Sequence, residues 1–181
     1  MRIIIMFLFG MTATATYASG VYIVESIEDG DTVVVRAVGK KDSIRIQLTG
    51  IDAPEDSNNA KLKVDIKKTG LDPEKLLIIG RAATDHIKAV ISPGMTVRLE
   101  ADFDQLDRYG RVPAIIFGPG KSTVSVNEQM IIDGYARYLT SDNLDVAFSK
   151  QLEQLQQKAI EKNRGLWGRD SQVTRLWSGL Q

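Results

Sequence analysis

Several short segments in the first quarter of the chain have the hydrophobic pattern of strands. Residues 21–24 and 32–38 are rich in β-branched side chains, and an acidic, glycine-containing turn separates them. Residues 43–48 alternate, with Ile44, Ile46 and Leu48 on one face. A period of two predicts strands with one buried face. We therefore expect three consecutive strands joined by short turns, a β-meander.

Downstream of Gly70 the apolar residues recur every three to four positions, the spacing of a helix with one buried face. Asp72, Pro73 and Glu74 predict the start of a helix that extends to about residue 92. The lysine-rich segment 56–70, just before it, is expected to be a long surface loop.

The rest of the chain predicts two further strands and two further helices. Residues 96–100 and 112–117 have strand patterns. Ser125 and Glu128 predict a capping box for a short helix ending near Gly134, and apolar spacing predicts a last helix over 144–162. This order of elements favours an α+β, mainly β fold: a five-stranded barrel with three packed helices.

The first eighteen residues have a different composition from the rest. Arg2 precedes an apolar run over residues 3–9, and small residues follow up to Ala18. This pattern predicts a secretory signal peptide over 1–18, cleaved after Ala15 or Ala18. We expect an exported protein, periplasmic or secreted. The apolar run is too short for stable membrane insertion, which needs about 20 residues.

Composition narrows the possible chemistry. The 181 residues include no cysteine and one histidine, His86, and the formal net charge is +0. Thiolate metal sites are thereby excluded, and mechanisms that need two histidines lose their support. His86 is expected to be a partly buried residue of a helix. Any basic surface for nucleic acid must be local, and we expect a monomer.

Three segments combine acidic residues with glycine or proline, and each is weak alone. Residues 29–32 (Asp-Gly-Asp-Thr) have the composition of a hairpin turn. Residues 50–55 (Gly-Ile-Asp-Ala-Pro-Glu) hold two carboxylates that could bind a hard cation, or simply end a strand. Residues 107–111 (Asp-Arg-Tyr-Gly-Arg) hold two arginines suited to phosphate, or to surface salt bridges.

Taken together and in this order, the three segments resemble the staphylococcal nuclease (thermonuclease) family. Residues 126–136, with Val-Asn-Glu at their start, and Gly165-Leu166-Trp167 are similar to later parts of that family. The resemblance covers roughly residues 21–168. It implies an OB-fold nuclease domain over 19–168, followed by a C-terminal tail over 169–181. We expect that tail to be loose, because so short a segment rarely holds a helix alone.

The resemblance also implies a Ca²⁺ site. Asp31 and Asp52 match the family's calcium-binding carboxylates, and Ala53 stands where a backbone carbonyl completes the metal shell. Glu55 matches the glutamate that orients or deprotonates the attacking water. Asp29 is expected to act from outside the first shell of ligands.

Arginine and tyrosine positions are implied in the same way. Arg111 matches one of two arginines that hold the scissile phosphate, while Arg108 and Tyr109 match positions that contact the phosphate end of the nucleotide. The second arginine of the family is replaced by Gln47, which brings no charge and no guanidinium fork. Arg45 shares the face of Gln47, about 6.6 Å along the strand, and is a possible substitute.

Three hypotheses about function follow. The first is an exported calcium-dependent nuclease that cuts DNA or RNA, slowed by Gln47. The second is a catalytically impaired OB-fold protein that binds nucleic acid without cutting it. Aromatic residues are 7% of the chain, which argues against a stacking surface for that purpose. The third is a protein-interaction module, for which no sequence feature speaks.

Overall fold

The computed structural model of the protein describes residues 18–140 and 144–180. The predicted signal peptide, residues 1–18, lies outside the described residues except for Ala18. Within the described part of the chain, no helix is both long and apolar enough to span a membrane.

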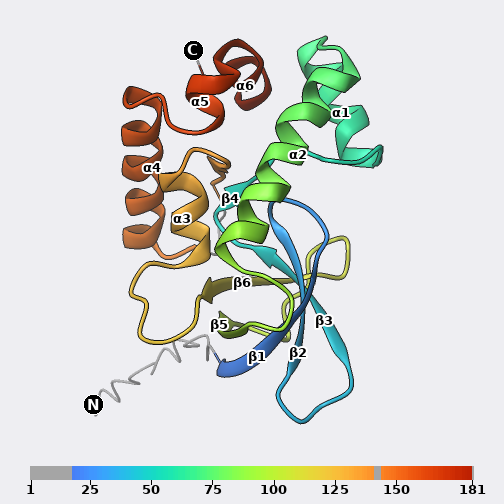
Figure 1. Cartoon of the computed structure of the whole chain (residues 1–181), viewed down its shortest axis with the longest axis vertical. Helices are drawn as coiled ribbons and strands as arrows, with labels where there is room; N and C mark the ends of the chain where they lie inside the picture. Colours follow the sequence, from blue (N-terminus) through green and yellow to red (C-terminus); the bar gives the residue numbers. More distant parts are fainter. Residues whose placement is uncertain (1–17, 141–143, 181) are drawn as a thin grey trace, which may run out of the picture.

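Five strands close into a barrel at one end of the molecule (Figure 1). They are joined in the order β1-β2-β3-β6-β5, with β5 returning to β1. All neighbours are antiparallel except β3 and β6, which run parallel. The strands are β1 (Ala18–Ile27), β2 (Thr32–Ala37), β3 (Ser43–Leu48), β5 (Thr96–Ala101) and β6 (Val112–Phe117). The predicted barrel and its β-meander are confirmed.

The barrel core follows from the alternation seen in the sequence. Ile46 and Leu48 of β3 are fully buried, and Val33 and Val35 of β2 and Leu99 of β5 belong to the same core cluster. One face of each strand thus removes its apolar area from water, which stabilises the fold by roughly 25 cal/mol for each Å² buried.

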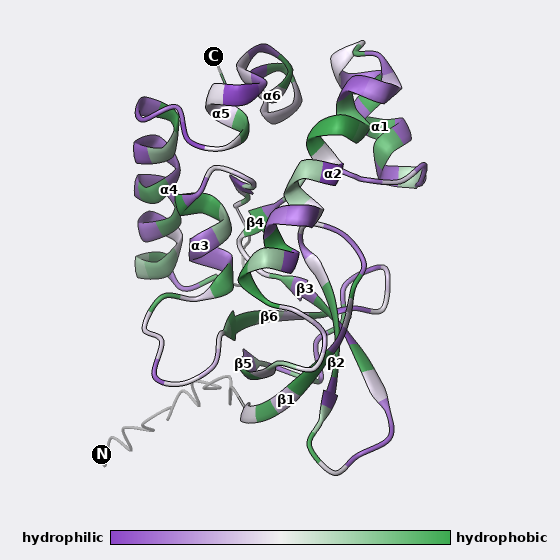
Figure 2. Ribbon diagram, in the orientation of Figure 1, coloured by the Kyte–Doolittle hydropathy of each residue, from purple (hydrophilic) through white to green (hydrophobic). Residues whose placement is uncertain are grey.

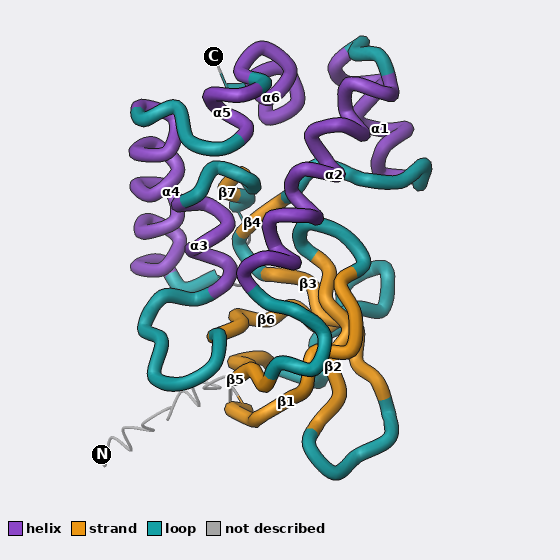
Figure 3. Tube along the Cα trace, in the orientation of Figure 1, coloured by secondary structure: helices purple, strands orange, loops and turns teal. Residues whose placement is uncertain are grey.

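The helices lie on one side of the barrel, as Figure 3 shows, and a two-stranded sheet of β4 (Ile51–Asp52) and β7 (Arg137–Tyr138) lies among them. In Figure 2 the helices are amphipathic, with green inner faces and purple outer faces. They are α1 (Ala60–Thr69), α2 (Pro73–Val90), α3 (Val126–Ile132), α4 (Val146–Glu161), α5 (Leu166–Arg169) and α6 (Ser171–Ser178).

The predicted helix starts are confirmed. The Asp72 carboxylate accepts a hydrogen bond from the Glu74 N–H at the start of α2. Ser125 and Glu128 form the expected capping box of α3. Asn127 then ties α3 to the barrel: its side chain accepts from the Ile116 N–H and donates to the carbonyls of Thr49 and Ala114.

The prediction of a surface loop over 56–70 is wrong for most of its length, because residues 60–69 form helix α1. Asn59 caps this helix by accepting from the Leu62 N–H, and Gly70 ends it in the left-handed conformation. The periodic signal was weak, since Leu62 and Ile66 alone carry the buried stripe among lysines. Tertiary packing against α2 supplies the stability that the local sequence lacks.

The expectation of a loose C-terminal tail is also wrong, since Ser171–Ser178 form helix α6. Trp177 is 1% exposed and packs in a second apolar cluster with Leu62 of α1 and Leu76 and Ile79 of α2. A helix of this length is marginal alone. It holds here because a single large indole is buried in a pocket formed by two other helices.

We predict that Trp177→Ala lowers the free energy of unfolding by about 3–5 kcal/mol, the usual cost of truncating a buried tryptophan. Leu176→Ala is the control, because Leu176 lies next to Trp177 but is 47% exposed; its effect should stay within about 0.5 kcal/mol. Urea denaturation followed by circular dichroism measures both. Equal losses in the two variants would contradict the docking of α6 by Trp177.

Candidate active site

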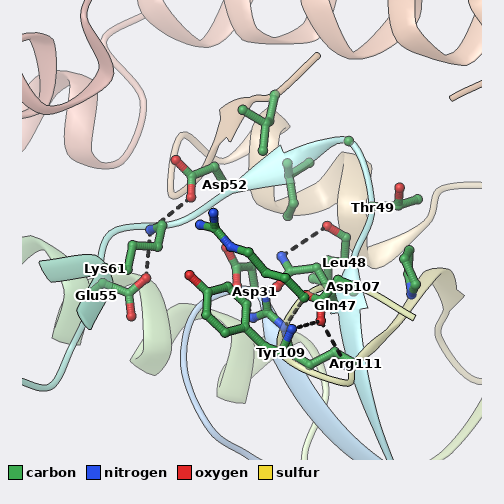
Figure 4. Close-up of a pocket in the computed structure, with 15 residues that line it drawn as sticks. Asp31, Gln47, Leu48, Thr49, Asp52, Glu55, Lys61, Asp107, Tyr109 and Arg111 are labelled. Atoms are coloured by element: carbon green, nitrogen blue, oxygen red, sulfur yellow. Dashed lines mark hydrogen bonds and ion pairs between the residues drawn. The ribbon is translucent and has the colours of Figure 1, made fainter. Parts of the chain in front are cut away.

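A pocket of about 420 Å³ opens beside the barrel, where the ends of β3 and β4 meet the loop before β6. Figure 4 shows acidic and basic side chains converging on it from segments far apart in the sequence. Most of the predicted site residues line it. The ionisable and amide side chains in its wall are Asp31, Gln47, Asp52, Glu55, Lys61, Asp107, Arg108, Tyr109 and Arg111.

Asp31 lies at the start of β2 and is 5% exposed. One carboxylate oxygen accepts from the Ala53 N–H at 2.9 Å, and the other from the Thr32 hydroxyl at 3.2 Å. Asp29 supports the turn by accepting from the Asp31 N–H at 3.0 Å. Burial first, and then the nearby charges of Asp29 and Asp52, raise the pKa of Asp31 to about 8. A cation bound beside these carboxylates would oppose that shift.

Asp52 and Glu55 share one counter-cation, the ammonium of Lys61. The Lys61 Nζ lies 2.9 Å from Asp52 Oδ1 and 2.7 Å from Glu55 Oε1. It also donates to the Ala53 carbonyl at 3.0 Å. Burial alone would lower the pKa of Lys61, but the carboxylates of Asp52, Asp31 and Glu55 raise it. Lys61 is therefore a firmly charged part of the site.

A second cation holds the other oxygen of Asp52. The small β4–β7 sheet places Arg137 directly opposite Asp52 in its register. The Arg137 guanidinium donates to Asp52 Oδ2 from Nε at 2.8 Å and from Nη2 at 2.6 Å. Arg137 also donates to the Ser178 carbonyl and lies 5.0 Å from the Trp177 ring centroid. Helix α6 thus contacts the residue that orients Asp52.

Arg111 is held in place by three oxygen partners. Its Nε donates to Asp107 Oδ2 at 2.8 Å and its Nη1 to the Thr32 hydroxyl at 2.8 Å, while Nη1 lies 3.9 Å from Asp31. These contacts direct a guanidinium edge toward the acidic residues. Although burial alone would raise the pKa of Asp107, hydrogen bonds from Arg111 and from the Tyr109 N–H lower it.

Arg108 and Tyr109 both lie in the pocket wall. Two guanidinium groups lie close to the Tyr109 ring: that of Arg108 is 4.8 Å from its centroid and that of Arg111 is 5.2 Å away. Cation–π attraction of this kind favours a fixed ring. Tyr109 is half-exposed and so can meet a ligand entering the pocket.

The structure places Gln47 in the pocket but not Arg45. The Gln47 Nε2 makes one long bond, 3.5 Å, to the Leu48 carbonyl, and its buried Oε1 has no hydrogen-bond partner among the described residues. Arg45 is instead bound to Glu28 on the outer surface, with Nε 2.9 Å from the carboxylate. Its guanidinium would have to leave Glu28 to reach the pocket.

The donor set suits a hard cation. Two carboxylate oxygens and one carbonyl oxygen lie within 3.0 Å of a single positive atom, the Lys61 Nζ. Oxygen donors from carboxylates and a carbonyl are what Ca²⁺ prefers. However, no three acidic or histidine side chains within the described ranges are already arranged to hold a metal ion. Asp52 and Glu55 are paired with cationic side chains instead, and Asp31 is turned toward the Ala53 N–H.

Sequence analysis missed four side chains that shape this site: Lys61, Arg137, Asp107 as a partner of Arg111, and Asn59, which donates to Glu55. Lys61 and Asn59 lie in the segment that was predicted to be a loop, so the directions of their side chains could not be inferred. Arg137 acts through the two-residue strand β7, which is too short to carry a pattern. Asp107 alone had a signal, namely its spacing of four residues from Arg111.

His86 lies outside the pocket, as expected of a helix residue. Its Nε2 is 2.9 Å from Asp133 Oδ2, and its ring stacks on Tyr135 with centroids 4.0 Å apart. The imidazole is thus bound to residues that follow α3 and does not line the pocket.

Fold and site together define a class: an OB-type barrel carrying a pocket in which buried carboxylates face arginines. The family model described as "Staphylococcal nuclease homologue" matches residues 45–169. The chain belongs to the staphylococcal nuclease family.

Individual relatives agree with this assignment. The chain is 31% identical to an "Uncharacterized endonuclease" of Escherichia coli, over 77% of this chain and 71% of that protein. It is 30% identical to a "Thermonuclease" of Staphylococcus hyicus, over 81% of this chain and 75% of that protein. Endonuclease YhcR of Bacillus subtilis is 27% identical over 88% of this chain, which spans only 12% of that much longer protein.

Gly80 allows α2 to pack closely against the backbone that carries Glu55, and this packing can be tested. A Cβ at this position would lie 2.0 Å from the Glu55 carbonyl oxygen, so glycine lets α2 pass against the backbone that carries Glu55. Alanine should favour the helix by about 1 kcal/mol. We predict that Gly80→Ala is nevertheless destabilising, by about 1–3 kcal/mol, because the overlap forces the backbone apart.

Thermal unfolding measures this effect, and Gly118→Ala is the control, because a Cβ there meets nothing within 4 Å. A Gly80→Ala protein as stable as the wild type would show that the close approach of Glu55 to α2 is not needed.

Proposed function

We propose that this chain is an exported, calcium-dependent nuclease that hydrolyses phosphodiester bonds of DNA or RNA. The proposal rests on one observation above all: Arg111 faces the buried carboxylates Asp31, Asp52 and Glu55 across a single open pocket. The relatives named endonuclease and thermonuclease support it. Members of the family are generally metal-dependent. Export rests on the sequence pattern of residues 1–18.

The side chains have complementary tasks in this chemistry. Asp31, Asp52 and the Ala53 carbonyl would hold Ca²⁺, which as a Lewis acid polarises a phosphoryl oxygen. Glu55, held by Asn59, would orient water and accept its proton. Arg111 would donate to the phosphate oxygens as their negative charge grows, while Asp107 and Thr32 fix its fork.

Arg108 and Tyr109 sit at the outer part of the site and would bind substrate. The half-exposed Tyr109 ring offers a stacking face for a base or sugar, and Arg108 a charge for a neighbouring phosphate. Neither side chain would select a base sequence, since stacking on a π-face and pairing with a phosphate do not read base edges.

The proposal is tested by incubating the purified protein with single-stranded DNA or RNA, in calcium and then in excess chelator. We predict cleavage in calcium alone. Asp52→Ala should lose calcium affinity in a calorimetric titration. Glu55→Gln should lower kcat by roughly 10²–10⁴, the usual contribution of a general base, with little change in KM. An unchanged kcat with a raised KM would make Glu55 a binding residue instead.

Gln47 marks the place where the chain departs from its family. We predict that Gln47→Arg raises kcat by up to about a hundredfold, because a guanidinium there adds charge opposite Arg111 that glutamine lacks. Arg45→Ala is the matched variant on the same strand face. It should change kcat little, since Arg45 is bound to Glu28 outside the pocket. Loss of activity in Arg45→Ala would show that Arg45 reaches the phosphate after all.

A non-cutting nucleic-acid binder is the second candidate, and the environment of Gln47 favours it. A buried, unpartnered amide oxygen stands where transition-state charge would need a cation. Binding of single-stranded DNA without any cleavage, in both wild type and Gln47→Arg and with calcium bound, would establish this alternative.

A further inference from the structure

The side chain of Lys61 lies against two of the proposed metal ligands, Asp52 and the Ala53 carbonyl, and against Glu55, the proposed water-orienting residue. Its Nζ lies 2.9 Å from Asp52, 2.7 Å from Glu55 and 3.0 Å from the Ala53 carbonyl oxygen. Figure 4 shows the ammonium between the two carboxylates. A divalent ion and this ammonium cannot both lie against the Asp52 and Ala53 oxygens, because Ca²⁺ lies 2.3–2.6 Å from its ligands. The two positive centres would overlap and repel.

From this overlap we propose that Lys61 is a tethered competitor of the metal, and that calcium binds only by displacing its ammonium from the carboxylates. The inference rests on the proposed function, in that Asp52 and the Ala53 carbonyl are taken as ligands of the metal and Glu55 as the group that orients its water. It adds a role that the family comparison does not assign: a lysine of α1 sets the calcium concentration at which the site fills.

The metal-free protein has a reason to keep this lysine. Asp52 is 4% and Glu55 6% exposed, and leaving such charges unpaired is strongly unfavourable. Arg137 neutralises the far oxygen of Asp52 but makes no ion pair with Glu55 in the described part of the chain. Lys61 supplies the remaining charge from within the chain, so the pocket stays folded when calcium is absent.

The displaced ammonium has a place to go. Asp65 lies one helical turn further along α1, with its Oδ2 3.8 Å from the Lys61 Nζ. That oxygen is buried and has no hydrogen-bond partner among the described residues. The four-carbon lysine stem is flexible, so a small swing replaces contacts to Asp52 and Glu55 with one to Asp65. Asp65 is thus the receiving group of a two-position switch.

The first test is a calorimetric titration of the purified protein with calcium chloride. A competitor that occupies the site in nine molecules of ten raises the apparent Kd about tenfold. Lys61→Met keeps the stem and removes the charge, so it should bind calcium about tenfold more tightly or better. Lys63→Met is the control, because Lys63 is an exposed lysine of the same helix, and its Kd should match the wild type. Equal affinity in Lys61→Met and wild type would overturn the proposal.

Stability gives a readout that needs no substrate. In chelator, Lys61→Met should melt at a lower temperature than wild type, and calcium should raise its Tm by more. If the variant is unfolded in chelator, calcium should refold it, as seen by circular dichroism. If Lys61→Met bound calcium no more tightly than the wild type, and calcium raised its Tm by no more, competition would be excluded.

A double-mutant cycle with Asp65→Asn tests the receiving group. Asp65→Asn should weaken calcium binding severalfold in the wild-type background, because the displaced ammonium loses its partner. In the Lys61→Met background the same change should have a smaller effect. Equal effects in both would show that Asp65 acts on the metal directly and does not receive Lys61.

Labelling of the wild type follows the displacement itself. An amine-reactive acetylating reagent, with peptide mapping by mass spectrometry, should modify Lys61 faster after calcium is added, while Lys63 stays constant. Slower or unchanged labelling of Lys61 would overturn the proposal. These measurements also separate it from the proposed function. If Lys61→Met bound calcium more tightly but the wild type cleaved no nucleic acid, the proposed nuclease function alone would be refuted. If the wild type cleaved nucleic acid in calcium but Lys61→Met and the wild type had equal calcium affinities, the competition alone would be refuted.

Discussion

The burial of several carboxylates in one pocket is the constraint on which the rest of the site depends. Asp31, Asp52 and Glu55 are each at most 6% exposed. Like charges removed from water repel strongly and lose their hydration. Cationic side chains from separate elements compensate these charges: Lys61 of α1, Arg137 of β7 and Arg111, which immediately precedes β6.

This need for counter-charge explains parts of the fold that the barrel alone does not require. Helix α1 carries Lys61, and the two-residue pairing of β4 with β7 brings Arg137 to Asp52. Helix α6 then packs on α1 and α2 through Trp177, while its carbonyl at Ser178 accepts from Arg137. The C-terminal segment thereby contributes to the geometry of an acid that lies more than a hundred residues earlier in the chain.

The barrel could be predicted from the sequence, while much of its covering could not. Strands such as Ser43–Leu48 have an alternating pattern that burial on one face dictates, and the Ser125–Glu128 capping box is local chemistry. Helix α1 has weak periodicity and helix α6 is only eight residues long, and both are stabilised by packing with α2 in one apolar cluster. Most of the predicted site residues line one pocket, but Lys61 and Arg137 were not predicted, because their contacts exist only once distant segments meet.

The sign of the charge in the pocket has a consequence for the order of binding. Four carboxylates line it, those of Asp31, Asp52, Glu55 and Asp107, against three cationic side chains, Lys61, Arg108 and Arg111. Most of those cations are already paired: Lys61 with Asp52 and Glu55, and Arg111 with Asp107. An anionic phosphate entering this pocket meets little free positive charge. A divalent cation reverses that balance locally and strengthens attraction in a partly desolvated site. Electrostatics in this pocket therefore favour binding of a cation before binding of an anionic phosphate.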